Sequence, residues 1–259
     1  FKVILGGPMM GSVTTDLSTP VTKTLSAIIV LPEEHSAIRE KNIEIETIKK
    51  IAKTVCCQCS RCTDMCPRHL IGHRLEPHKI MRQFSWSVDL NNEIFKEALI
   101  CSECGVCEKY ACPMMIFPRQ INSLLKQKLL EKGIKWEATQ DRYNPSLFRE
   151  FRKIPTDRLI ERLNISQYSG HPKYFDQEIE TKQVSIPLRQ HIGAPAKPVV
   201  KVGDYVNKGD LIAEIPENSL GARIHASISG TITYVGEKII IWANNNKGTA
   251  DGTESNRSN

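Results

Sequence analysis

The 259-residue chain has no long apolar segment. A membrane-spanning helix needs roughly 18 or more consecutive apolar residues, and the best apolar run near the start, residues 25–31, is far shorter. Like charges also form no block, because 35 basic and 29 acidic residues are spread along the chain and leave a net charge of +6. We therefore predict no integral membrane segment and no nucleic-acid partner.

Signatures of secretion and of nucleotide binding are missing as well. The sequence shows no basic segment followed by an apolar run and a small-residue cleavage site, so no signal peptide is predicted. This favours the reducing cytoplasm. There is no G-x-G-x-x-G between a strand and a helix, no P-loop and no Ser-His-Asp signature. The glycine-rich residues 6–11 lack the Lys-Ser/Thr ending of a P-loop and are interpreted as a structural turn.

The overall composition is that of a folded protein. Hydrophobic residues make up 40% of the chain and charged residues 25%, close to the average globular protein. The length allows one large domain or about two small ones. The chain opens on Phe1 in an apolar run, and we interpret it as a fragment without its true N-terminus.

Cysteine is confined to one region. All nine cysteines lie between Cys56 and Cys112, and the rest of the chain has none. A secreted disulfide scaffold would spread its cysteines over the fold. This distribution therefore indicates a site and not a disulfide framework.

The cysteines form two runs with one rhythm. The runs are Cys56-x2-Cys59-x2-Cys62-x3-Cys66-Pro67 and Cys101-x2-Cys104-x2-Cys107-x4-Cys112-Pro113. The first has the spacing of bacterial ferredoxins, in which three thiolates wrap one [4Fe-4S] cluster and the fourth reaches the neighbouring cluster. We predict two [4Fe-4S] clusters with crosswise ligands: Cys56, Cys59, Cys62 and Cys112 for one, and Cys101, Cys104, Cys107 and Cys66 for the other.

Other interpretations of the cysteines are open. Zinc also takes four thiolates, although its sites commonly use two separated C-x2-4-C pairs. Buried structural thiols have no reason to repeat one spacing twice. Cys57 falls outside the two-residue rhythm, so we interpret it as a packed thiol or as a neighbour of the ligands.

Histidine and arginine accompany the first run. His69, His73 and His78 follow this run, and His69 and His73 lie four residues apart. These histidines either include a His-pair metal site or face solvent or lie beside the cluster, and no zincin-type carboxylate accompanies them. Arg68, Arg74 and Arg82 either screen the negative charge of a cluster or form a solvated basic face.

The spacing of apolar residues predicts a series of helices that is followed, further along the chain, by a series of strands. Apolar residues recur at helical spacing in residues 36–55, 77–86, 90–100 and 156–163 and from Pro118 to the stop signal at Gly133. Short β-type runs follow at residues 199–202, 211–215, 223–228, 231–235 and 238–241, separated by glycine turns. Residues 1–31 are expected to form strand, loop and strand.

These segments give an α+β chain with five parts. The helical two-cluster ferredoxin-like domain covers residues 36–133, and residues 134–183 are a connecting region. A small all-β domain covers residues 184–243. Residues 244–259 carry no large apolar side chain and are predicted to be disordered. Residues 1–35 are assigned to the end of an upstream region.

The motifs resemble a known family. The first run, followed by Leu70-Ile71-Gly72-His73, looks like the ferredoxin segment of the PduS family, the cobalamin reductases of propanediol utilisation. The second run and the loop Gly6-Gly7-Pro8-Met9-Met10-Gly11 are similar to the same family. That loop, with Pro20-Val21-Thr22-Lys23, is shared with the C subunits of Rnf electron-transport complexes.

The C-terminal part resembles the barrel-sandwich hybrid domain of both families, on the runs Pro187–Ala196 and His225–Gly230. This domain follows the cysteines, as in the PduS family, whereas it leads in the Rnf subunit. Related biotinyl and lipoyl domains carry a lysine at a hairpin tip; Asn218, Ser219 and Leu220 occupy the expected tip here, so no swinging-arm cofactor is expected. By resemblance, residues 1–35 end an SLBB and flavoprotein-like region.

The resemblance implies an oxidoreductase in which NADH reduces FMN, the clusters accept electrons singly and a corrinoid is reduced. FMN and NADH would bind upstream, so this chain by itself is expected to carry electrons without oxidising NADH. Implied partners are a flavoprotein domain or subunit and a corrinoid-dependent enzyme or adenosyltransferase. The implied location is the cytoplasm or a bacterial microcompartment. The alternatives are an electron-input subunit like the Rnf C subunit, peripheral to a membrane, and a structural metal module.

Overall fold

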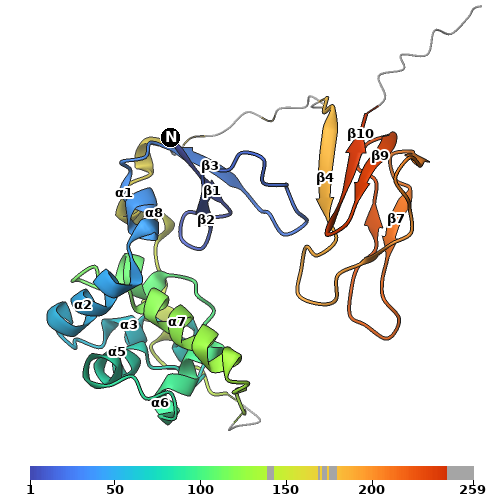
Figure 1. Ribbon diagram of the computed structural model, residues 1–259. Coiled ribbons are helices and arrows are strands. Elements are labelled where there is room, and N and C mark those ends of the chain that lie inside the picture. Colours follow the sequence, from blue (N-terminus) through green and yellow to red (C-terminus); the bar gives the residue numbers. More distant parts are fainter. Residues whose placement is uncertain (139–142, 169, 171–173, 175–179, 244–259) are drawn as a thin grey trace, which may run out of the picture. The chain divides into compact units, whose positions relative to one another are not determined.

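The computed structural model describes residues 1–138, 143–168, 170, 174 and 180–243. They fall into two compact units, the first comprising Phe1–Thr15 with Ser26–Pro172 and the second Asp16–Leu25 with Lys173–Asn259. The described residues contain both helices and sheets (Figure 1), which confirms the α+β class. The predicted tail at residues 244–259 lies outside the described residues.

The first unit begins with a small antiparallel sheet. Its strands are β1 (Lys2–Leu5), β2 (Ser12–Thr14) and β3 (Ile28–Leu31), in the order β2-β1-β3. Ile4 and Leu31 pack on Ala37 and Ile38 of helix α1 (Ser36–Arg39), and this contact forms a core of its own. The expectation of two strands was incomplete, because β2 also pairs with β1.

The helix expected over residues 36–55 is interrupted. Helix α1 and the 3-10 turn η1 (Glu40–Asn42) end before an extended Glu44, and helix α2 (Ile45–Val55) follows. Ile38 packs in the core of the sheet, whereas Ile48 packs in the core of the cysteine region. A single straight helix over residues 36–55 would not bury Ile38 and Ile48 in two different cores. Tertiary packing therefore interrupts the helix that the sequence pattern predicts.

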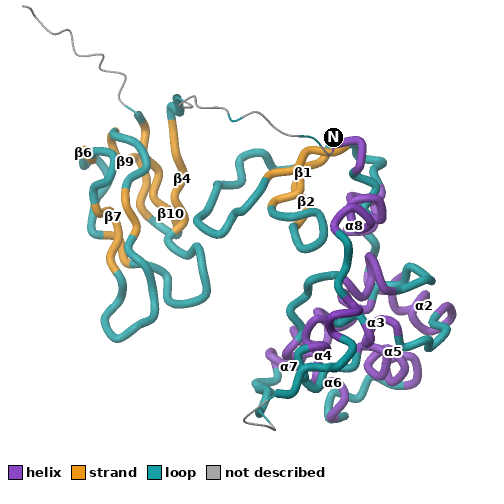
Figure 2. The backbone as a smooth tube through the Cα atoms, turned by 180° about the vertical axis from the view of Figure 1, so that it is seen from behind, coloured by secondary structure: helices purple, strands orange, loops and turns teal. Residues whose placement is uncertain are grey.

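Three helices frame the cysteine region: α2, α5 (Pro77–Trp86) and α7 (Pro118–Glu131). Their buried faces share one hydrophobic core that includes Ile48, Ile80, Phe84, Ile121 and Leu125. Figure 2 shows the three helices in one group at the same end of the first unit. The prediction of α5 was correct at both ends, because proline opens the helix and its apolar face is regular.

Helix α7 ends as its sequence predicted. Gly133 has a φ of +72°, Gly133 N donates to Leu130 O at 2.9 Å and Ile134 N donates to Leu129 O at 3.0 Å. These two bonds make a Schellman motif, which glycine favours because it has no Cβ.

The helix expected over residues 90–100 begins later. Asn92 caps α6 (Glu93–Lys96) by accepting a hydrogen bond from Ile94 N at 3.0 Å, and the 3-10 turn η2 (Glu97–Ile100) continues to the second cysteine run. The predicted helix at residues 156–163 is α8 (Thr156–Arg162). Shorter segments are α3 (Arg61–Asp64), α4 (Pro67–Leu70), η4 (Arg149–Arg152) and η5 (Ser166–Tyr168).

The described part of the second unit is built from short antiparallel strands. These are β4 (Gln183–Pro187), β5 (Lys197–Pro198), β6 (Tyr205–Val206), β7 (Leu211–Glu214), β8 (Ile224–His225), β9 (Gly230–Val235) and β10 (Lys238–Trp242). They form sheets in the orders β4-β10-β9-β6 and β5-β7-β8. Ile212, Ile232, Ile239 and Ile241 are among the buried side chains of its core. Within the described residues no strand pairing closes either sheet into a barrel.

Several strand predictions needed correction. Residues 199–202 form no strand: they follow β5, and Val199 and Val202 are exposed. The run at residues 223–228 contributes only the two residues of β8. Strands β4 and β6 were not predicted, since each gains its partner, β10 or β9, only in the folded unit.

Residues 16–25, which lie between β2 and β3 in the sequence, belong to the second unit. Lys23 N donates to Gln190 Oε1 at 3.0 Å, and Lys23 Nζ donates to Arg223 O at 2.8 Å. Thr24 Oγ1 donates to Gln190 O at 3.4 Å. Lys23, the last residue of the motif Pro20-Val21-Thr22-Lys23, and Thr24 after it therefore hold this segment on the all-β unit.

The glycine-rich loop at residues 6–11 gives a test of the packing. A Cβ on Gly11 would lie 2.6 Å from Leu5 O and 2.7 Å from Gly7 O, whereas a Cβ on Gly7 meets nothing within 4 Å. We expect Gly11→Ala to lower the free energy of unfolding by about 1–3 kcal/mol. Gly7→Ala is the matched control and should change it by less than about 0.5 kcal/mol. Urea titrations followed by tryptophan fluorescence measure both; equal effects would contradict the close approach at Gly11.

Candidate iron-sulfur site

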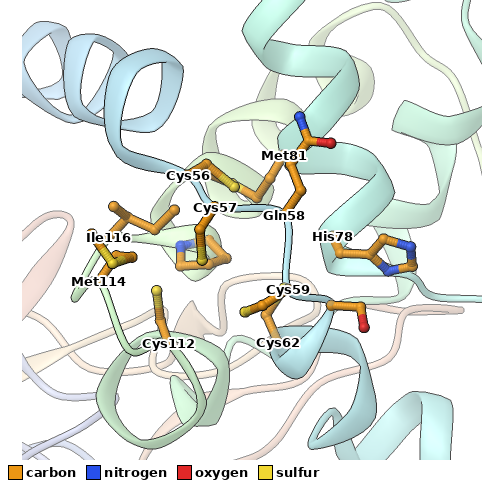
Figure 3. Close-up of a pocket in the computed structure, with 12 residues that line it drawn as sticks. Cys56, Cys57, Gln58, Cys59, Cys62, His78, Met81, Cys112, Met114 and Ile116 are labelled. Atoms are coloured by element: carbon orange, nitrogen blue, oxygen red, sulfur yellow. The ribbon is translucent and has the colours of Figure 1, made fainter.

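The first cysteine loop lies between α2 and α3. Cys56, Cys59 and Cys62 line one pocket together with Cys112, which comes from the end of the second run. Figure 3 shows Cys112 facing this loop from the opposite side of the pocket. Residues far apart in sequence thus contribute thiols to one space.

The second pocket repeats this arrangement. Cys101, Cys104 and Cys107 line it together with Cys66, the last cysteine of the first run. The structure therefore places the eight cysteines in the two groups that the spacing predicted. Whether these groups ligate iron stays a prediction.

Both loops have the same backbone conformation. Gln58 and Glu103, each two residues after the first cysteine, have φ values of 55° and 57°. Ser60 and Gly105, two residues further on, have φ values of 60° and 79°. Left-handed residues turn the chain sharply, so the loop curls and its three thiols face inward.

The extra residue of the second run is absorbed locally. Cys62 lies in the α-helical turn α3, whereas Cys107–Ala111 form a π-helical turn, η3. A π turn closes its hydrogen bonds one residue later than an α turn, so it holds one more residue. Cys66 (φ −69°, ψ 118°) and Cys112 (φ −75°, ψ 116°) then leave their turns in nearly the same conformation.

The thiols are costly to ionise without a cation. Burial first, and then the neighbouring thiols, raise the pKa of Cys62 to about 12. Burial also raises the pKa of Cys66 to about 11, against the lowering effect of backbone hydrogen bonds from His69 and Arg68. Burial also raises the pKa of Cys107 well above its ordinary value. Metal binding needs thiolates, so iron has to displace these protons.

Hydrogen-bond donors lie beside the sulfur of Cys101. Glu103 N donates to Cys101 Sγ at 3.4 Å, and the side-chain amide of Asn122 donates to it at 3.6 Å. Lys126 Nζ anchors the same loop by donating to Cys101 O at 3.0 Å and pairing with Glu103 Oε1 at 3.1 Å. The second loop is thereby fastened to helix α7.

Paired charges surround the second loop. The buried carboxylate of Glu108 pairs with Arg119 Nε at 2.9 Å, and Lys109 pairs with Glu40. Lys41 donates to Met9 O at 3.0 Å and to Gly11 O at 2.6 Å. Burial first, and then Arg119 and Lys109, lower the pKa of Lys41 to about 8.

The glycine-rich loop packs on the second cysteine loop. A Cβ on Gly105 would lie 3.5 Å from Met9 Cε and 3.7 Å from Met9 Cβ. The loop remains a structural turn, as expected, with Gly11 N donating to Gly7 O at 2.8 Å. Its contact with the cysteine site, however, was not predicted from the sequence.

Cys57 also lines the first pocket and is exposed. The thiols that raise the pKa of Cys62 are Cys112, Cys56 and Cys59. Both Cys56 and Cys57 line this pocket, so the choice of Cys56 as the ligand, made from spacing, stays a prediction.

The histidines of the first run have separate surroundings. His78 Nδ1 lies 2.7 Å from Thr63 Oγ1, and its ring points away from the cysteines in Figure 3. The ring of His73 contacts that of Tyr143 at an interplanar angle of 44°, with ring centroids 4.2 Å apart. The Nδ1 atoms of His69 and His73 are buried and have no partner among the described residues.

None of the arginine side chains flanking the first run lines a thiol pocket, although the backbone N–H of Arg68 donates to the Cys66 sulfur. Arg74 pairs with Glu97 at 3.4 Å, and Arg82 is exposed. Arg119, which was not singled out from the sequence, lines the second pocket instead. Neither Arg119 nor Asn122 carries a sequence signal, since both reach the pocket only through the packing of α7.

The donor set fits iron-sulfur clusters. The first pocket is lined by four proposed ligands and by Cys57, the second by four cysteines, and all nine cysteines are free. In the described part of the chain no three His, Cys, Asp or Glu side chains are placed to hold a single metal ion. A polynuclear cluster requires four thiols around a space wider than a single metal ion fills.

Comparisons with known proteins agree with this geometry. The 4Fe-4S dicluster domain family matches residues 55–117, and the RnfC barrel sandwich hybrid domain family matches residues 170–249. Cobalamin reductase PduS of Salmonella typhimurium is 41% identical over 238 residues, which are 92% of this chain and 52% of that protein. The PduS of Citrobacter freundii gives the same identity and coverage.

The chain is PduS-like and RnfC-related. The C subunit of the proton-translocating ferredoxin:NAD(+) oxidoreductase complex of Clostridium ljungdahlii is 51% identical over 55 residues, which are 21% of this chain and 12% of that protein. The chain spans about half the length of the PduS relatives it matches. The 4Fe-4S dicluster domain of this PduS-like chain supports a role in electron transfer.

None of the helices in the described ranges combines the length and the apolar character needed to cross a bilayer.

The thiol pKa values make a prediction for the metal-free chain. Cys66, with a pKa near 11, has roughly a hundredfold less thiolate at pH 8 than a thiol of ordinary pKa, because each pKa unit is a factor of ten. Since the thiolate is the nucleophile, iodoacetamide should alkylate Cys66 far more slowly than the exposed Cys59. Time-resolved peptide mass spectrometry measures both rates. Similar rates for the two thiols would contradict the burial of Cys66.

Proposed function

We propose that the chain holds two [4Fe-4S] clusters with crosswise ligands. Cys56, Cys59, Cys62 and Cys112 are the proposed ligands of the first cluster, and Cys101, Cys104, Cys107 and Cys66 those of the second. The single observation that carries this proposal is the pairing of each trio with the fourth cysteine of the other run around one pocket. Each cluster, when bound, accepts and releases one electron at a time.

The two sites differ in their exposure to partners. Cys59 in the first pocket is exposed, whereas Cys101 and Cys107 in the second are buried. Electron exchange with another protein or a corrinoid requires close approach, which the first pocket permits. The buried second site is then a relay within the chain.

The proposed pathway follows the PduS relatives. Single electrons pass from a flavin domain or subunit, reduced by NADH, through the clusters to a corrinoid or protein acceptor. Alignment with proteins named cobalamin reductase over 92% of the chain supports this acceptor. A corrinoid-dependent enzyme or adenosyltransferase is the proposed partner, in the cytoplasm or a bacterial microcompartment.

A second candidate is electron input to a membrane-associated complex. It is favoured by the match of residues 170–249 to the RnfC barrel sandwich hybrid domain. The two candidates share the ligands and differ in the acceptor, so an acceptor assay separates them.

Cysteine variants test the ligand assignment. The anaerobically reconstituted chain should contain about eight iron and eight sulfide atoms. Cys66→Ala should lose about half of the iron, because a three-cysteine site binds its cluster weakly. Cys57→Ala is the matched control and should retain all of it. Iron and sulfide analysis with EPR spectroscopy measures the outcome; a colourless zinc-loaded protein, or equal iron in both variants, would reject the assignment.

Electron delivery tests the acceptor. The chain, reduced by a one-electron donor and freed of excess reductant, should reduce hydroxocobalamin, and Cys112→Ala should do so at least about tenfold more slowly because one cluster site is incomplete. Stopped-flow absorbance follows both the corrinoid and the iron-sulfur chromophore. If cytochrome c is reduced and cobalamin is not, the corrinoid assignment fails although electron transfer stands.

A further inference from the structure

Asn122 is the one amide side chain of α7 that lines the second thiol pocket, and it is fully buried. Its Nδ2 donates to Cys101 Sγ at 3.6 Å, within reach of a hydrogen bond to sulfur. Its Oδ1 is also buried and finds no partner among the described residues. Of the two polar atoms of this amide, therefore, only Nδ2 has a hydrogen-bond partner among the described residues, and that partner is the Cys101 sulfur.

An unpaired buried acceptor is costly, so a helix core has a physical reason to use leucine at this position. An N–H that donates to a negatively charged sulfur can offset this unpaired acceptor, because such charge-assisted hydrogen bonds are stronger than neutral ones. The sulfur only accepts, which also sets the orientation of the amide. Burial raises the pKa of Cys101 overall, whereas the hydrogen bonds from Glu103 N and then from Asn122 lower it.

The first site offers a natural comparison. Helices α5 and α7 both begin with proline, and the residue four positions later lines a thiol pocket: Met81 after Pro77, and Asn122 after Pro118. Both side chains are buried. The repeated framework thus presents an apolar thioether to the first pocket and an N–H donor to the second.

We propose that Asn122 raises the reduction potential of the second cluster by donating its side-chain N–H to the sulfur of Cys101. Reduction adds one negative charge to the cluster and its thiolates, so an N–H aimed at a ligand sulfur stabilises the reduced state more than the oxidised state. This inference rests on the ligand assignment proposed above. It concerns one cluster only, since Met81 donates no hydrogen bond.

The test is an EPR-monitored potentiometric titration of the reconstituted full chain. Asn122→Leu keeps the branching of the side chain at Cγ and removes the donor. We expect one of the two one-electron midpoints to fall by about 59 mV, which is a tenfold change in the reduction equilibrium. Asn122→Asp, which has the same shape, should lower the same midpoint because its carboxylate adds negative charge. In both variants the other midpoint should stay unchanged.

Met81→Leu is the matched control and should leave the midpoint that responds to Asn122 unchanged. Full iron content with unshifted midpoints in Asn122→Leu overturns the role of Asn122 and leaves the ligand assignment intact. A wild-type chain without two reducible clusters overturns both.

A measurement on the wild-type chain covers the case in which the variants fail to fold. With 15N-labelled asparagine side chains, the reduced protein should show a 15N hyperfine coupling in pulsed EPR. The absence of that coupling overturns the proposal.

Discussion

Each thiol pocket is completed by a cysteine from the other run, and this exchange constrains the rest of the first unit. Cys112 lies with the first trio and Cys66 with the second. If either run moved alone, it would withdraw its fourth cysteine from the pocket of the other run. The helices that frame the loops, α2, α5 and α7, share one hydrophobic core that also includes Cys66, Cys101 and Cys112. Packing and the thiol site are therefore one structure, and disruption of either affects the other.

The two thiol pockets share one backbone framework but differ in the side chains that surround them. Their loops share left-handed residues at matching positions, and their fourth cysteines share one backbone conformation. The π turn at Cys107–Ala111 shows how a one-residue insertion is accommodated without moving Cys112. Against this common framework the differences stand out: Asn122 takes the place that Met81 has in the first half, and paired charges of Glu108 and Arg119 adjoin only the second loop.

Local patterns predicted the elements that do not depend on distant contacts. Helix α5 was correct at both ends, and the Schellman stop of α7 at Gly133 followed from one glycine. Predictions failed where distant partners decide the structure. The break before α2 separates two cores, and β4 and β6 exist because β10 and β9 offer them hydrogen bonds. A sequence pattern records the period of an element and not its partners.

The sequence by itself determined the chemistry of the site: eight cysteines at repeated spacing, and the grouping of each trio with the opposite fourth thiol. Spacing suffices for this because a short loop leaves few ways to turn three thiols inward. Only the tertiary structure decided what surrounds the thiols. Asn122, Arg119 and Met9 reach the second loop through the packing of a helix and of a distant glycine-rich turn, and such contacts arise from the folded core and leave no local signature.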